Sequence, residues 1–132
     1  MEGGQTNEFR PLIFVAEDDD SNFKLIKAII GKKCDIQWAK NGEEIVALFK
    51  EYGNEAKAIL MDIKMPVMNG LDATKIIRGE NKEIPIIMQT AYAFSSDKEN
   101  AMNAGASEVL VKPITLSILR NTLTKYFPEL VW

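Results

Sequence analysis

The stretch LIFVAEDDD, residues 12–20, joins a short apolar run to four consecutive acidic residues. Three further apolar runs follow, AILM at 58–61, IIM at 86–88 and VLV at 109–111. Short continuous runs of this kind are typical of strands buried on both faces of a parallel sheet. The stretch Cys34–Ala39 differs, because apolar and polar residues alternate in it, which predicts a strand at a sheet edge with one face partly wet.

Segments with helical periodicity separate these runs. Apolar residues recur at helical spacing in 45–52 and 116–127, and three more helices are predicted near 23–30, 71–77 and 98–104. The order is strand then helix, five times over, which predicts an α/β fold with a doubly wound parallel sheet and helices on both faces. Four glycines, at positions 31, 53, 79 and 105, each lie near a predicted helix end, where the left-handed conformation costs glycine least.

The composition is that of one globular domain. The 132 residues are 46% hydrophobic and 27% charged, close to globular averages. The formal net charge of −3 is too weak to indicate nucleic-acid binding, and no apolar stretch approaches the roughly 20 residues that span a bilayer. We expect residues 1–10 to form a flexible leader and residues 11–132 to form one soluble, cytoplasmic domain without membrane contact of its own.

The chain contains one cysteine and no histidine. One cysteine cannot form an internal disulfide, and no cysteine cluster is available for structural zinc. Without histidine there is no Ser-His-Asp or Cys-His centre and no imidazole metal ligand. Any chemistry must therefore use carboxylates, hydroxyls, lysines or a hard cation.

Polar residues follow four of the predicted strands. They are Glu17 to Asp20, Asp62, Thr90 and Lys112, and parallel strands would bring them to one edge of the sheet, where ligands bind in such folds. Two carboxylates about 5 Å apart repel by ~3 kcal/mol at an effective dielectric near 20, so such a cluster favours a raised pKa or a bound cation. Oxygen ligands alone indicate Mg²⁺ or Ca²⁺. Lys112 and Thr90 could hold a phosphate, carried either by a ligand or covalently by a carboxylate.

Simpler explanations exist for each residue taken singly. The acidic run could serve merely to cap a helix beginning near Ser21, and Asp62 could be a turn residue. Four successive acids are more than a cap needs, so we expect Asp20 or Ser21 to be the cap and Glu17 and Asp18 to be left for the site. A calcium-binding loop would need glycine at Phe23 and glutamate at Ile29, so that hypothesis fails. Neither glycine-rich nucleotide motif, G-x-G-x-x-G after the first strand or G-x-x-x-x-G-K-[ST] anywhere, is present.

The chain resembles a receiver domain of two-component signalling. The matching pieces are FVAEDDDSN at 14–22, ILMDIKMPVMNG at 59–70, IIMQTAYA at 86–93 and VLVKPI at 109–114. The resemblance implies a flavodoxin-like (βα)5 fold whose five-stranded sheet has the order 2-1-3-4-5. The longer stretch at 90–114 is similar to the receivers of hybrid sensor histidine kinases.

The resemblance also assigns roles. Asp62 would accept a phosphoryl group from a phosphohistidine on a partner histidine kinase or phosphotransfer domain. Mg²⁺ would be held by Asp18, Asp62, the backbone carbonyl of Lys64 and, through a water, Glu17. Thr90 and Lys112 would hold the phosphoryl oxygens, and the domain would catalyse its own phosphorylation and dephosphorylation. The peptide bond before Pro113 is expected to be cis.

The switch residues depart from the family pattern. Thr90 is expected to move toward the phosphoryl, and an aromatic residue usually stands where this chain has Val109, whose side chain has few rotamers. We therefore expect Tyr92 or Phe94 to supply the aromatic. In the family, the positions that Lys64 and Tyr92 hold tune the lifetime of the acyl phosphate, so the resemblance implies that role for these two residues. Protein targets would bind the face made by the helix near 98–104, the strand at 109–111 and the helix at 116–127.

Three functions remain open. The first is a receiver of a hybrid sensor kinase, whose parent could be membrane-bound, and the second is a stand-alone regulator. The third is a pseudo-receiver that acts only by interaction, which the intact Glu17, Asp18, Asp62, Thr90 and Lys112 disfavour. An independent phosphatase of the haloacid dehalogenase type is weaker still, because Lys64 stands where such enzymes have a second aspartate.

Overall fold

A computed structural model describes residues 9–92 and 96–132 of the chain. Five strands form one sheet in which every neighbouring pair is parallel, in the order β2-β1-β3-β4-β5. The predicted fold class and strand order are therefore confirmed. The strands are β1 (Leu12–Ala16), β2 (Asp35–Ala39), β3 (Ala56–Asp62), β4 (Ile86–Thr90) and β5 (Glu108–Val111).

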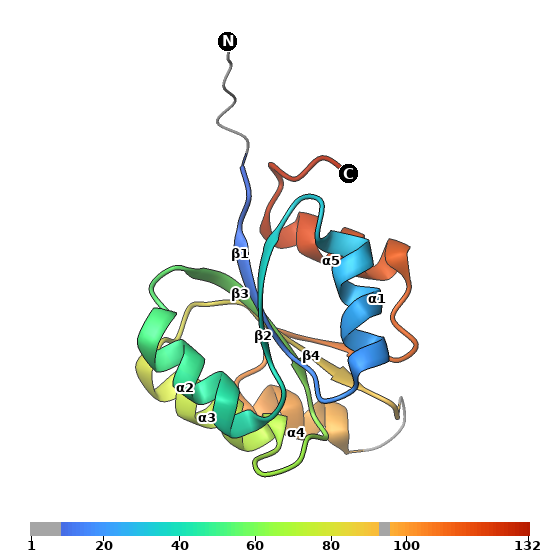
Figure 1. Cartoon of the computed structure of the whole chain (residues 1–132). Coiled ribbons are helices and arrows are strands. Elements are labelled where there is room, and N and C mark those ends of the chain that lie inside the picture. The colour runs from blue at the N-terminus through green and yellow to red at the C-terminus, as the bar shows by residue number, and fades with distance from the viewer. Residues whose placement is uncertain (1–8, 93–95) are drawn as a thin grey trace.

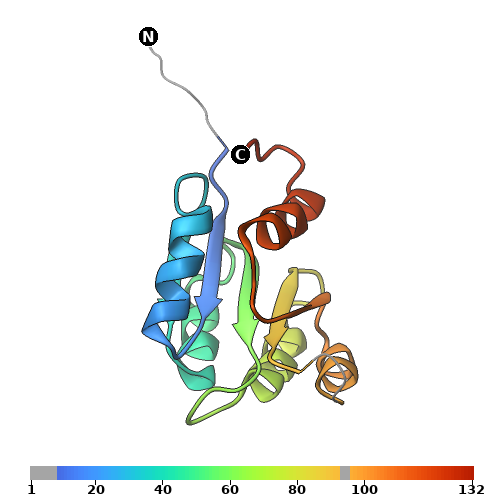
Figure 2. The same cartoon turned by 90° about the vertical axis from the view of Figure 1, so that its right-hand side faces the viewer.

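Helices cover both faces of the sheet (Figures 1 and 2). Helices α1 and α5 lie together on one face, and α2, α3 and α4 lie side by side on the other. None of the helices in the described ranges is long and apolar enough to cross a bilayer. Their bounds are α1 (Asp20–Ile30), α2 (Gly42–Tyr52), α3 (Gly70–Glu80), α4 (Asp97–Ala104) and α5 (Leu116–Tyr126).

The central strands are buried on both faces, which explains their continuous apolar runs. In β1, Ile13 and Val15 pack in the cluster beneath α1 and α5, whereas Phe14 packs in the cluster beneath α2 and α3. All three side chains are fully buried. Each such burial contributes about 1.5–3 kcal/mol, so the two clusters fix which face of each strand meets which helices.

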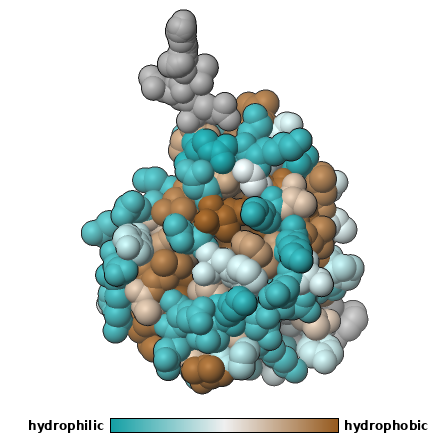
Figure 3. All heavy atoms as spheres, in the orientation of Figure 1, coloured by the Kyte–Doolittle hydropathy of each residue, from teal (hydrophilic) through white to brown (hydrophobic). Residues whose placement is uncertain are grey.

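Strand β2 is the edge strand that the alternating sequence predicts. It pairs only with β1 in the sheet order, and its burial alternates between exposed and half-buried until Ala39. The space-filling view in Figure 3 shows the side of the molecule that faces the viewer in Figure 1. Apolar side chains lie in the middle of that side, and hydrophilic residues lie around them.

Side chains in the loops that precede α1, α2 and α3 cap the N-termini of these helices. Asp19 accepts hydrogen bonds from the backbone N–H groups of Ser21 and Asn22, at 2.7 and 3.1 Å. Asn41 and Asn69 cap α2 and α3 in the same way. The cap of α1 is thus Asp19 rather than the predicted Asp20 or Ser21. Because Asp19 is used locally, Glu17 and Asp18 are the acids left at the end of β1.

The four glycines lie at or next to helix ends, as predicted. Gly31 and Gly53 end their helices with φ of −64° and −59°, and Gly79 lies inside α3. Only Gly105 is left-handed, with φ of 115°, because α4 ends there in a tight turn.

The last two residues of the predicted leader are packed rather than free. The rings of Phe9 and Phe127 lie 6.1 Å apart, and Arg10 donates a 2.6 Å hydrogen bond to the carbonyl of Lys32 while pairing with Asp35 at 3.2 Å. These contacts anchor the chain just before β1. The rest of the predicted leader, residues 1–8, lies outside the described residues.

Candidate functional site

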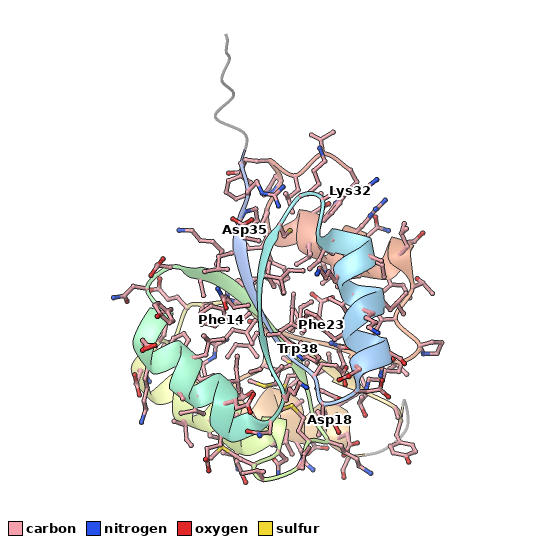
Figure 4. The ribbon with its side chains drawn as sticks, viewed as in Figure 1. Phe14, Asp18, Phe23, Lys32, Asp35 and Trp38 are labelled. Carbon is pink, nitrogen blue, oxygen red and sulfur yellow. The ribbon has the colours of Figure 1, made fainter. Side chains whose placement is uncertain are left out.

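Carboxylates from two neighbouring strands meet at the carboxyl edge of the sheet. Glu17 and Asp18 directly follow β1, and Asp62 is the last residue of β3, which pairs with β1. One carboxylate oxygen from each of the three lies within 4.8 Å of the others. Figure 4 labels Asp18 at this edge, beside the start of α1. The strand pairing thus gathers residues that are 45 positions apart in the sequence.

A cleft of about 220 Å³ opens over these carboxylates. Thr90, the last residue of β4, and Lys112, which directly follows β5, line the same cleft. Six of the seven residues predicted at the strand ends therefore line one cleft: Glu17, Asp18, Asp19, Asp62, Thr90 and Lys112. Asp20, in the first turn of α1, does not. The polar residues that line the cleft are Glu17, Asp18, Asp19, Asn22, Asp62, Lys64, Gln89, Thr90, Tyr92, Asp97 and Lys112.

Glu17 is a fully buried acid with an unsatisfied oxygen. Its Oε2 accepts a 3.2 Å hydrogen bond from the backbone N–H of Asp19, but its Oε1 has no hydrogen-bond partner. Burial first, and then the charge of Asp62, raise the pKa of Glu17 from 4.5 to about 7, against the opposing effect of Lys112. Such an arrangement is costly unless a positive charge compensates it.

Lys112 forms ion pairs with two of these acids. Its Nζ donates a 3.0 Å hydrogen bond to Oδ2 of Asp62 and lies 3.9 Å from Oε1 of Glu17. The Lys112–Pro113 peptide bond is cis, the isomer that the family resemblance implies. Lys112 supplies one positive charge against the three carboxylates of the cluster, so these four groups together are acidic.

The donor set fits a hard divalent cation. Three carboxylates converge, one of them carries a buried oxygen with no hydrogen bond, and the groups available are all oxygens. Mg²⁺ uses few carboxylates, keeps several waters and binds phosphate oxygens, which suits an open cleft of this size. The arrangement can therefore hold a cation beside Asp62 and neutralise a phosphoryl group there.

Thr90 is oriented toward the start of α4. Its Oγ1 donates a 3.1 Å hydrogen bond to Oδ2 of Asp97, the first residue of α4, and accepts one from the backbone N–H of Tyr92 at 3.1 Å. The hydroxyl thus links the end of β4 to α4 across the segment between them. Phe94, named above as a possible switch aromatic, lies outside the described residues.

Lys64 and Tyr92 meet across the mouth of the cleft. The Nζ of Lys64 lies 5.0 Å from the centroid of the Tyr92 ring, a cation–π contact between the β3–α3 and β4–α4 loops. The Tyr92 side chain is about half exposed. Val109, in β5, is half-buried and packs against the core beneath α2 and α3.

The loop that carries Lys64 is tightly constrained. Val67 has a φ of 71°, which is strained for a β-branched residue, and Met68 N–H donates to Pro66 O at 2.8 Å to close the turn. A Cβ at Gly42 would collide with the backbone of Met68, and one at Gly70 with the backbone of Asp62. Both glycines are therefore required for the close approach that holds this loop beside Asp62.

Sequence reasoning missed two residues that support the site. Asp97 holds the Thr90 hydroxyl, and Trp38 donates from its indole Nε1 to the carbonyl of Glu17 at 2.8 Å. Trp38 could have been noticed as a large aromatic residue near the end of an edge strand. Asp97 gave no signal, because an acid in the first turn of a helix is common.

Comparison with known proteins identifies relatives along nearly the whole chain. The family described as response regulator receiver domain matches residues 13–124. Hybrid signal transduction histidine kinase I of Dictyostelium discoideum is 37% identical over 129 residues, which cover 89% of this chain. The chain spans only about 7% of that kinase's length.

Two solved structures are similar to this fold. The receiver domain of sensor histidine kinase PA1611 from Pseudomonas aeruginosa, with a magnesium ion in its active-site cleft, has a TM-score of 0.83 and 29% identity; the match covers 91% of this chain and 99% of that one. The receiver domain of Ssk1 from Saccharomyces cerevisiae, solved with the histidine phosphotransfer protein Ypd1, has a TM-score of 0.82 and 28% identity, with 92% and 93% covered.

Proposed function

Because the chain belongs to the family of response regulator receiver domains, we propose that Asp62 accepts a phosphoryl group from a phosphohistidine on a partner protein. The observation that carries this proposal is the convergence of Asp62 with Lys112 at 3.0 Å, beside two further carboxylates and Thr90 in one cleft. The chain has no histidine of its own, so the donor is another domain or another protein.

The proposed transfer forms one bond and breaks one. A carboxylate oxygen of Asp62 attacks the phosphorus, the P–N bond breaks, and the imidazole leaves with the electron pair. Lys112 and Thr90 would stabilise the phosphoryl oxygens by charge and hydrogen bonding. Lys112 is already held at Asp62, so this part of the site is organised before the phosphoryl arrives.

Mg²⁺ is the proposed cofactor. Asp18, Asp62 and the backbone carbonyl of Lys64 would hold it directly and Glu17 through a water, and the bound ion would offset the negative charge that the phosphoryl group brings. The buried Oε1 of Glu17 supports a positive charge at this place, because that oxygen has no hydrogen-bond donor.

The proposed domain is residues 11–132, and its proposed context is a hybrid sensor kinase. The similarity to a hybrid histidine kinase supports this, although the chain spans a small part of that protein. A stand-alone regulator is the alternative. In either context the partner carries phosphohistidine, and a protein target would bind the face formed by α4, β5 and α5.

We propose that output passes through Thr90 and Asp97. A phosphoryl group on Asp62 would compete with Asp97 for the Thr90 hydroxyl, and losing that 3.1 Å hydrogen bond would loosen the first turn of α4. Such a route does not require an aromatic residue at Val109. Whether Tyr92 also turns inward stays a prediction.

Intact mass spectrometry tests the acceptor. The chain is incubated with a small-molecule phosphodonor and Mg²⁺, and a single acid-stable, base-labile phosphoryl adduct is expected. Asp62→Asn should abolish the adduct, whereas the matched change Asp72→Asn, at an exposed position in α3, should leave it intact. A wild-type chain that takes up no phosphoryl group at any Mg²⁺ concentration would favour the pseudo-receiver. Steady release of phosphate from phosphomonoesters would favour the phosphatase.

A further inference from the structure

The peptide groups around Glu17 are held by strand β2. The N–H of Glu17 donates to the carbonyl of Ala39 at 3.0 Å, which continues the sheet by one bond beyond the strand. The carbonyl of Glu17 accepts a 2.8 Å hydrogen bond from the indole Nε1 of Trp38. That carbonyl belongs to the peptide bond joining Glu17 to Asp18, so the indole limits rotation at the point where the two acids diverge.

Trp38 is itself fixed against the first turns of α1. Its ring stacks on Phe23 with centroids 3.9 Å apart and planes within 1°, and Figure 4 shows the two labelled side chains together between β2 and α1. Lys40 lies over the indole at 4.7 Å and pairs with Asp20 at 3.9 Å. The acidic segment 17–20 is therefore bounded at one end by contacts from β2 and at the other by Lys40, the residue that follows β2.

These contacts point to a role beyond packing. An aromatic stack on an edge strand would be served equally by any flat apolar ring, and only the indole N–H reaches the Glu17 carbonyl. A cation site tolerates displacements of its ligands of only about 0.5 Å. We propose that Trp38 is a positioning residue that sets the places of Glu17 and Asp18 for a divalent cation. This inference rests on the proposed function, because it concerns the same cation site.

The substitution that isolates this role is Trp38→Phe. Phenylalanine keeps an aromatic ring for the stack on Phe23 but has no N–H for the Glu17 carbonyl. Outer-shell partners of metal ligands typically contribute 10–100-fold to metal affinity, so we expect Mg²⁺ to bind about tenfold more weakly. Trp132→Phe is the matched control, because its indole also donates a hydrogen bond, to Thr124 at 3.0 Å, but outside the site.

Isothermal titration of Mg²⁺ into the unphosphorylated chains gives the first measurement. Trp38→Phe should raise the dissociation constant about tenfold and Trp132→Phe should leave it within twofold of wild type. In phosphorylation assays, Trp38→Phe should raise the half-saturating Mg²⁺ concentration by the same factor. At saturating Mg²⁺ the variant should be phosphorylated at the wild-type rate. Equal Mg²⁺ affinity in wild type and Trp38→Phe would overturn the inference and leave the acceptor role of Asp62 intact. A wild-type chain that binds no Mg²⁺ would overturn both the positioning role of Trp38 and the proposed Mg²⁺-dependent function.

Fluorescence keeps the inference testable should Trp38→Phe fail to fold. In the Trp132→Phe chain the only remaining tryptophan is Trp38. Its emission should change on Mg²⁺ addition and saturate at the dissociation constant found by titration. Emission that stays constant through saturation would contradict a connection between the indole and the cation site.

Discussion

The buried charge of Glu17 makes a sharp prediction about stability and pH. Glu17→Gln replaces the carboxylate by a neutral group of the same size in a site that is fully buried in the folded chain. The pKa of Glu17 rises from 4.5 to about 7 through burial and the nearby charge of Asp62. At 1.36 kcal/mol per pKa unit, holding this carboxylate ionised in the folded state costs about 3 kcal/mol.

The sign of the effect follows from proton binding. Between pH 4.5 and 7 the folded state holds a proton on Glu17 that the unfolded state has lost, so the free energy of unfolding falls as pH rises through this window. Above pH 7 the full penalty applies, and below pH 4.5 there is none. Without Mg²⁺, Glu17→Gln should therefore be more stable than wild type by about 3 kcal/mol at pH 8 and nearly equal to it at pH 4.5.

Urea unfolding in the presence of a chelator measures this difference at several pH values. The exposed acid Glu83 supplies the control, because Glu83→Gln should change stability by less than about 0.5 kcal/mol at every pH. Adding Mg²⁺ should narrow the difference, since the ion stabilises wild type by the binding-linkage logarithm and Glu17→Gln much less. The reasoning fails if Glu17→Gln is no more stable than wild type at pH 8, or if its advantage is the same at pH 5 and pH 8.

Further predictions concern the loops around the site. Lys64→Ala or Tyr92→Leu should speed hydrolysis of the acyl phosphate about two- to fivefold, measured as loss of adduct mass, since an exposed cation–π contact is worth about 0.5–1 kcal/mol. Val67→Gly should raise the free energy of unfolding by about 1 kcal/mol through relief of backbone strain, and a decrease would contradict this. Gly42→Ala should destabilise by about 1–3 kcal/mol through its collision with Met68, whereas Gly79→Ala, in open space, should stabilise slightly.

The periodicity of the sequence was sufficient for the α/β fold class and for the alternation of strands and helices, whereas the strand order 2-1-3-4-5 was implied by the family resemblance. The short apolar runs become central strands because both faces of β1, β3 and β4 are covered, and β2 alternates because it is an edge. Boundaries were less predictable, since β3 begins at Ala56 and ends at Asp62, beyond the apolar run at both ends. Hydrogen bonding to neighbouring strands, and not hydrophobicity, sets where a strand ends.

Glycine positions show a second limit of the sequence. Gly42 and Gly70 have no local conformational signal, because neither has a positive φ. They are needed only because another segment of backbone passes against them in the folded chain. A requirement that depends on a distant neighbour is invisible to local pattern.

By itself the sequence determined that the chain is a five-fold repeat of strand and helix with acids, a hydroxyl and a lysine at the strand ends. Only the tertiary structure decided which of these groups touch: Lys112 pairs with Asp62, Thr90 turns to Asp97, and the indole of Trp38 holds the carbonyl of Glu17. The physical reason is that hydrophobic patterning is local and fixes the strands, whereas charge pairing and hydrogen bonding act between groups that meet only after the strands have paired.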